Sequence, residues 1–211
     1  MVGRIQEHLE AIYGIRCELR AAEFLLDEAQ ARKLGGSLNA QEELLVLEEG
    51  GDLEVGLFLS NDLIDRLSPY EAAPTEAVLE GELPGYCQMA EGVSHFVYLT
   101  HTAALDRRVS LLELEAQAEV DKFALCVLSR WGGGARDFAV ELFSRLFDRV
   151  GFLPGLPAPE AWRYGEANRL ARAFCRRLLP LVEARRMDKL LAALRYSYRL
   201  GAEAKLRHLE R

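Results

Sequence analysis

Two segments of the chain carry carboxylates and a histidine at spacings that could bind a metal ion or move a proton. Glu91 and His95 are four residues apart, and so are Glu115 and Glu119. In a helix this spacing places both members of a pair on one face, about one turn apart. Carboxylates and imidazole are ligands that iron, manganese and zinc accept between helices. These four residues are therefore a candidate site for a divalent metal.

Helical periodicity predicts the elements that must position these side chains. Apolar residues recur at helical spacing over residues 85–105 and again over 110–130, and a polar turn separates the two segments. The second segment has two apolar stripes, so we expect this helix to be buried on two sides. Its carboxylates would then occupy a narrow polar strip between the stripes.

The position of the turn between these helices decides which side chains of the first helix lie opposite which side chains of the second. A turn near Arg107 would place His95 opposite Glu119 and Glu91 beside Lys122. Unpaired carboxylates are costly to bury, so we predict a direct interaction between His95 and Glu119. An ion pair is favoured over a metal, because known four-helix metal sites use Glu-x-x-His and this Glu-x-x-x-His has no second copy. The alternative is a set of solvated charge pairs within each helix.

No catalytic motif accompanies this cluster. Ser94 and His95 are neighbours on a helix and point about 100° apart, so they cannot act together as nucleophile and base. The glycines at 132–134 follow a helix, which favours a turn over a phosphate loop. Four cysteines without paired spacing indicate buried thiols. We therefore expect no cofactor, with a divalent metal at the candidate site as the alternative.

Charge is distributed unevenly along the chain. Residues 1–160 contain 13 Lys+Arg and 28 Asp+Glu, whereas residues 161–211 contain 13 and 5, within a net charge of −7. This asymmetry predicts a basic surface that contacts an acidic protein partner or the acidic part of the chain itself. The acidic remainder would repel a phosphate backbone, which argues against nucleic acid. The cations predicted to form this surface are Arg169, Arg172, Arg176, Arg177, Arg195 and Arg199.

The hydrophobic pattern predicts an α+β fold that is predominantly helical. An apolar and then alternating run predicts a β-hairpin over residues 43–59, with its turn at residues 50–52 and a helix before it. The hairpin must pack on helices or gain a third strand, for which the segment near Phe24 is the candidate; one continuous helix over residues 16–34 is the alternative for that segment. A bundle of about five helices follows, with a break at Pro180. The expected helices span residues 3–12, 85–105, 110–130, 136–150, 159–179 and 183–200.

The polar segment 70–84 predicts a linker or boundary between a small α/β part, residues 1–70, and the helical bundle, residues 85–211. One cooperative domain is the alternative. Charged residues interrupt the N-terminal apolar run, and no run of about 18 apolar residues occurs, so we expect a cytoplasmic protein that does not enter a membrane. The oligomeric state is left open. Together these features predict a non-catalytic adaptor that binds a protein through its basic C-terminal helices, with the exposed hairpin 43–59 as a candidate second contact. A metal-dependent enzyme or metal sensor is the alternative.

Overall fold

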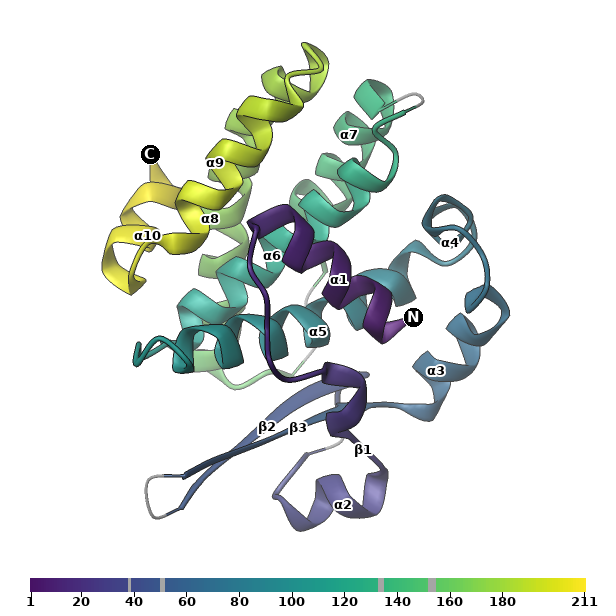
Figure 1. Ribbon diagram of the computed structural model, residues 1–211, viewed down its shortest axis with the longest axis vertical. Coiled ribbons are helices and arrows are strands. Elements are labelled where there is room, and N and C mark those ends of the chain that lie inside the picture. The colour runs from purple at the N-terminus through teal and green to yellow at the C-terminus, as the bar shows by residue number, and fades with distance from the viewer. Residues whose placement is uncertain (38, 50–51, 133–134, 152–154) are drawn as a thin grey trace.

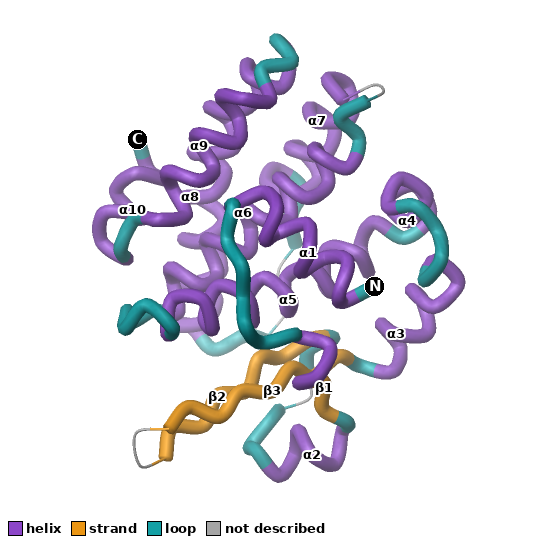
Figure 2. The backbone as a smooth tube through the Cα atoms, in the orientation of Figure 1, coloured by secondary structure: helices purple, strands orange, loops and turns teal. Residues whose placement is uncertain are grey.

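The computed structural model describes residues 1–211 apart from 38, 50–51, 133–134 and 152–154. The described residues form ten α-helices and one three-stranded sheet, which confirms the predominantly helical α+β fold (Figures 1 and 2). Most of the helices lie above the sheet in Figure 1, and the short helix α2 (Glu28–Lys33) lies below it.

The predicted hairpin is present. β2 (Glu42–Glu49) pairs antiparallel with β3 (Asp52–Leu59) along its whole length. β1 (Leu25–Leu26) pairs parallel with β3 and is the third strand expected near Phe24. The strand order is β1-β3-β2, so β2 is an edge strand. Residues 50–51, predicted to form the turn, lie outside the described residues.

The sheet buries apolar residues on both faces. Leu57 packs against α5 (Leu83–Ala103) as part of the main core. On the other face, Leu45 and Phe58 pack with Ala31 of α2 in a smaller cluster. A two-stranded hairpin is marginally stable by itself in water, so these contacts hold it on the helical body.

The centre of the molecule is the helical hairpin formed by α5 and α6 (Leu111–Ser129). The Ser110 side chain accepts a hydrogen bond from the main-chain N–H of Glu113, which fixes the start of α6. Both α5 and α8 (Ala158–Glu183) pack against α6. This arrangement confirms the predicted burial of α6 on two sides.

The first helix and the last part of the chain lie against each other. α1 (Val2–Tyr13) packs on α5 and on α9 (Met187–Arg199). The ring of Tyr13 stacks on the ring of Tyr198 with 3.9 Å between centroids. The guanidinium of Arg195 donates to the Ile12 carbonyl at 2.7 Å. The N-terminal helix is therefore part of the bundle.

One predicted helix boundary is wrong. α8 continues through Pro180 to Glu183, because Leu181 and Val182 pack on the core and hold the last turn although proline lacks an N–H group. The helix expected over 136–150 is α7 (Ala135–Phe143), which continues as a π-helical segment to Asp148. The remaining helices are α3 (Asn61–Leu67), α4 (Thr75–Gly81) and α10 (Ala202–Glu210).

The segment predicted as a linker contains α4, which packs against α5 and α6. Whether residues 1–70 and 85–211 fold separately stays a prediction. The four cysteines are free and buried, as expected. None of the helices in the described part of the chain combines the length and hydrophobicity needed to cross a bilayer. The location in the cell also stays a prediction.

Candidate metal centre

Three of the four candidate ligands come together between the two central helices. Glu91 and His95 on α5 meet Glu115 on α6, and one ligand atom from each lies within 4.8 Å of the others. The side chains of His95 and Glu115 are 8% and 9% exposed. The site is therefore enclosed in the protein, although the sequence alone also allowed a solvated face.

His95 lies among carboxylates. Its Nε2 is 3.4 Å from Glu115 Oε2, and its Nδ1 is 3.9 Å from Glu42 Oε2. Burial opposes a charge on the imidazole, but the neighbouring carboxylates of Glu115, Glu42 and Glu91 outweigh it and raise the pKa of His95 to about 9. Nε2 has no hydrogen-bond partner of suitable geometry among the described residues. One buried nitrogen thus faces the carboxylates without a directed bond.

Glu42, the first residue of β2, completes the ring of carboxylates around His95. Burial raises the pKa of Glu42 to about 8, against the opposing effect of His95. Its Oε2 is also buried without a hydrogen-bond partner in the described structure. Glu42 was not predicted as part of the site because it lies on the hairpin, far along the chain from α5.

Lys122 occupies the end of the cluster nearest Glu91. Its Nζ is 2.8 Å from Glu91 Oε2, the contact predicted from the sequence, and 2.9 Å from Glu119 Oε1. Burial disfavours the Glu91 carboxylate, but the ammonium lowers the pKa of Glu91. Burial raises the pKa of Glu119 despite the same ammonium.

The predicted pair between His95 and Glu119 is wrong. Among the described residues, Glu119 pairs with Lys122, and His95 pairs with Glu115 and Glu42. The reason is how far α6 is shifted along α5: Glu115 lies opposite His95, and Glu119 lies one turn further along α6. Sequence spacing gave the correct face of α6 but the wrong turn.

Arg163 brings a third helix to the cluster. It lies near the start of α8, and its Nε is 3.4 Å from Glu115 Oε1. The sequence analysis included its charge in the basic C-terminal segment without assigning it to this site. The centre therefore draws on β2, α5, α6 and α8.

A second buried polar network lies one turn away on the same two helices. The Asp121 carboxylate on α6 accepts hydrogen bonds from the Ser94 hydroxyl at 2.5 Å, from the Gln117 amide at 2.7 Å and from the Tyr13 hydroxyl. Burial raises the pKa of Asp121 to about 6, against these three donors. Each donor comes from a different element or turn, so Asp121 connects α1, α5 and α6.

Lys205 of α10 extends this network. Its Nζ donates to the Tyr98 hydroxyl at 2.5 Å and to Gln117 Oε1 at 2.7 Å, and Tyr98 donates to Glu113 at 2.6 Å. Burial lowers the pKa of Lys205 to about 7, against the nearby carboxylates of Glu113 and Asp121. Every bond has a clear donor and acceptor, which is the arrangement of a structural network.

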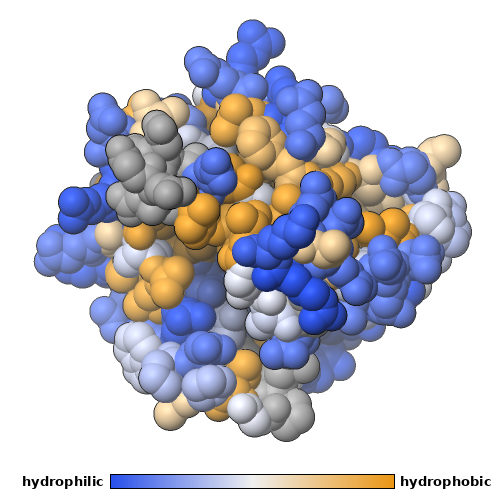
Figure 3. Space-filling model, turned by 90° about the horizontal axis from the view of Figure 1, so that it is seen from below, coloured by the Kyte–Doolittle hydropathy of each residue, from blue (hydrophilic) through white to orange (hydrophobic). Residues whose placement is uncertain are grey.

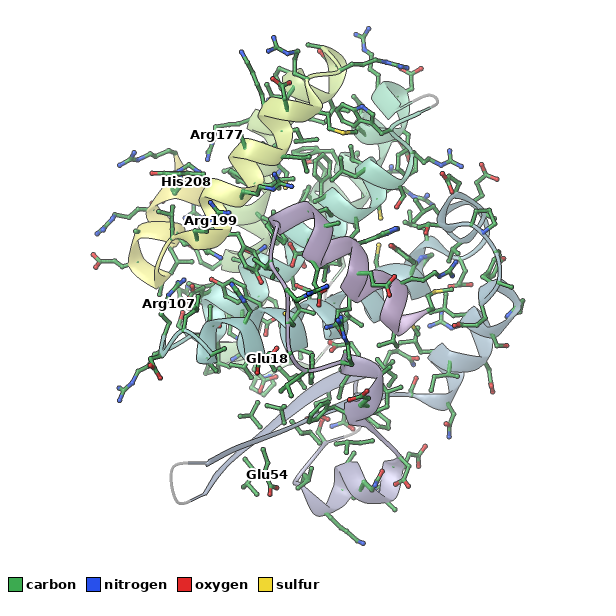
Figure 4. All side chains as sticks on the ribbon, viewed as in Figure 1. Glu18, Glu54, Arg107, Arg177, Arg199 and His208 are labelled. Atoms are coloured by element: carbon green, nitrogen blue, oxygen red, sulfur yellow. The ribbon has the colours of Figure 1, made fainter. Side chains whose placement is uncertain are left out.

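The six arginines predicted to bind an acidic partner lie on α8 and α9, and four of them already have partners in the chain. Two form ion pairs with carboxylates. Arg177 and Arg195 donate to main-chain carbonyl groups. Among the described residues, Arg176 and Arg199 have no hydrogen bond or ion pair; Arg199 lies on α9 (Figure 4). Within the described part of the chain, these two of the six predicted arginines have no side-chain partner.

Comparison with protein families, with curated proteins and with solved structures finds no match for this chain. Its chemistry therefore has to be argued from its own geometry.

Gly92 of α5 lets the hairpin approach the metal centre. A Cβ at this position would lie 2.9 Å from Glu42 Oε2 and 3.0 Å from Leu57 Cδ1. Alanine normally stabilises a helix relative to glycine, but here the added methyl would push the sheet away. We expect Gly92→Ala to lower the free energy of unfolding by about 1 to 2 kcal/mol in urea denaturation.

Gly165 of α8 is the matched control, because no atom lies within 4 Å of its added Cβ. Gly165→Ala should raise stability by about 0.5 to 1 kcal/mol. Equal stabilisation by both changes would contradict the close approach at Gly92.

Proposed function

We propose that this protein binds one divalent transition-metal ion through Glu91, His95 and Glu115. The observation that carries the proposal is the convergence of one ligand atom from each within 4.8 Å. His95 Nε2 is buried, lies 3.4 Å from Glu115 Oε2 and has no hydrogen-bond partner of suitable geometry among the described residues. Glu42 on β2 would add a fourth ligand or hold the imidazole through its Nδ1.

The charges of the cluster support a divalent ion. Its carboxylates are Glu42, Glu91, Glu115 and Glu119. Lys122 and Arg163 supply two positive charges, so the cluster has a net charge of −2 when its four carboxylates are ionised and His95 is neutral. A buried group needs its charge balanced, and one divalent ion would do so. Protonation of His95 and Glu42 would give the same balance without a metal.

The ligand types favour zinc, manganese or ferrous iron. One imidazole with two or three carboxylates is a mixed nitrogen and oxygen set, whereas calcium and magnesium prefer oxygen ligands alone. A given site usually binds zinc more tightly than manganese or ferrous iron, so zinc is the most sensitive probe of the three.

A regulatory or structural role for the ion agrees better with the geometry than catalysis does. The candidate ligands His95 and Glu115 are only 8% and 9% exposed. Two cavities of about 410 and 440 Å³ are lined by residues outside the cluster. Because Glu42 belongs to β2, the ion would connect the hairpin to the bundle, and metal supply would control how firmly the hairpin is held.

Titration calorimetry of chelator-treated protein with Zn²⁺ tests this proposal. We expect one saturable site per chain and a loss of affinity of at least about 100-fold in His95→Ala, because a first ligand is removed. His101→Ala is the matched control, since His101 is on the same helix but outside the cluster, and it should leave the affinity unchanged. Calcium should not compete.

Two outcomes would overturn the proposal. One is the absence of saturable zinc binding in wild-type protein that is shown to be folded by circular dichroism. The other is equal binding in wild type and His95→Ala. Either result would leave the cluster as a network of ion pairs.

A further inference from the structure

The free edge of the hairpin is the strongest feature that the metal centre does not use. β2 pairs only with β3, and none of its residues makes a main-chain hydrogen bond to another described element. The Ser60 N–H donates to the Gln41 carbonyl across the register at 2.8 Å. Main-chain groups alternate along an antiparallel pair, so Leu44, Val46 and Glu48 direct their N–H and C=O groups to the free edge.

The side chains near this edge include exposed aliphatic groups. Val46 is 48% exposed and Leu47 is 41% exposed, on opposite faces of the strand. Seen from below, the surface of the molecule gathers apolar residues near its centre with hydrophilic residues around them (Figure 3). An exposed edge strand with apolar side chains is a template for another strand.

Charge identifies the kind of strand that this edge would accept. No lysine or arginine occurs from Leu34 to Asp65. The same stretch contains eight acidic residues. Glu42 lies in the metal centre and Asp62 pairs with Arg66, and the other six are Glu43, Glu48, Glu49, Asp52, Glu54 and Asp65. Glu54 of β3 is exposed, and in Figure 4 it lies on the lower side of the hairpin. A second copy of this chain would bring a like-charged strand against this one, which is unfavourable.

We propose that β2 binds an extended segment of another protein in which lysine or arginine alternates with apolar residues. The segment adds a fourth strand at the β2 edge. Its main chain pairs with the outward groups of Leu44 and Val46, its apolar side chains cover Val46, and its cations complement the acidic composition of residues 34–65. This surface shares β2 with Glu42 of the metal centre, but the main-chain groups of Leu44 and Val46 are not metal ligands, so the proposal does not require a bound ion.

Fluorescence anisotropy with a labelled peptide of sequence KVRVKVRV tests the proposal, with EVEVEVEV as the charge-reversed control. We expect the basic peptide to bind the full-length protein and the acidic one not to bind. Raising NaCl from 50 to 500 mM should weaken binding several-fold, because the exposed charges are screened.

Val46→Pro separates edge pairing from charge. The Val46 N–H points outward, so proline at this position removes a group needed by an added strand but none needed by β3. We expect the affinity for KVRVKVRV to fall at least tenfold in Val46→Pro. The matched control Val46→Thr keeps the N–H and the strand preference, and should change the affinity less than threefold.

Hydrogen exchange supplies a readout that does not depend on the folding of the proline variant. In wild-type protein, the amides of Leu44 and Val46 should become protected when KVRVKVRV binds. Equal binding of both peptides, no binding of the basic peptide, unchanged exchange at these amides, or a concentration-dependent dimer that protects them without peptide would each overturn the proposal.

Discussion

Asp121→Ala is expected to lower the free energy of unfolding by about 3 kcal/mol near pH 7. The carboxylate is 1% exposed and accepts hydrogen bonds from Ser94, Gln117 and Tyr13. Alanine would leave three buried donors without this acceptor, and each such donor costs about 1 to 3 kcal/mol. Removing the carboxylate also removes the free-energy cost of burying its charge, so the expected loss is smaller than the sum of these costs.

Asp65→Ala is the matched control for this change. Asp65 is an exposed residue of α3 whose side chain makes no hydrogen bond or ion pair with the described residues. Its replacement should change stability by less than about 0.5 kcal/mol in the same urea denaturation. Asp121→Asn should recover part of the loss, because an amide oxygen can still accept. A loss in Asp121→Ala no larger than in Asp65→Ala would show that the network adds nothing to stability.

The sequence was most informative where a pattern is local. The alternation around residues 43–59 predicted β2 and β3, and helical spacing predicted α5 and α6. These patterns depend on which face of one element is buried, and the spacing of apolar residues within that element marks the buried face. The end of α8 was not predictable in this way, because tertiary packing tolerates Pro180 in its last turns.

The metal centre was only partly visible in the sequence. Glu91 and Glu115 could be assigned to facing helices because the two helices are consecutive. Glu42 and Arg163 reach the same point from β2 and α8, and no spacing along the chain indicates that approach. Asp121 did carry a signal, since a carboxylate surrounded by apolar positions on a two-sided helix has to be paired.

Metal-free protein is expected to lose stability as the pH rises from 6.5 to 9, and His95 is the main cause. The folded-state pKa of His95 is raised to about 9, above the ordinary value of 6.5. The folded state therefore binds more protons than the unfolded state in this window. The contribution of His95 is complete below pH 6.5 and is lost by about pH 9, at about 1.4 kcal/mol per pH unit at most.

Two other buried groups, Glu42 and Lys205, also change the free energy of unfolding over this pH range. The pKa of Glu42 is raised to about 8, so its contribution also falls with rising pH, from 4.5 upward. The pKa of Lys205 is lowered to about 7, so its contribution has the opposite sign between pH 7 and 10.5. The effect of His95 is therefore best measured as the difference between wild type and His95→Gln, because Lys205 is common to both proteins.

Urea denaturation of both proteins in chelator, at intervals from pH 6 to 9.5, measures that difference. Wild type should exceed His95→Gln by about 2 to 3 kcal/mol at pH 6, and the two should converge near pH 9. A difference that is constant with pH would contradict the charged imidazole between Glu42 and Glu115. Because a metal ligand must be neutral, the same proton would compete with zinc, so zinc binding should tighten over the pH range in which this stabilisation disappears.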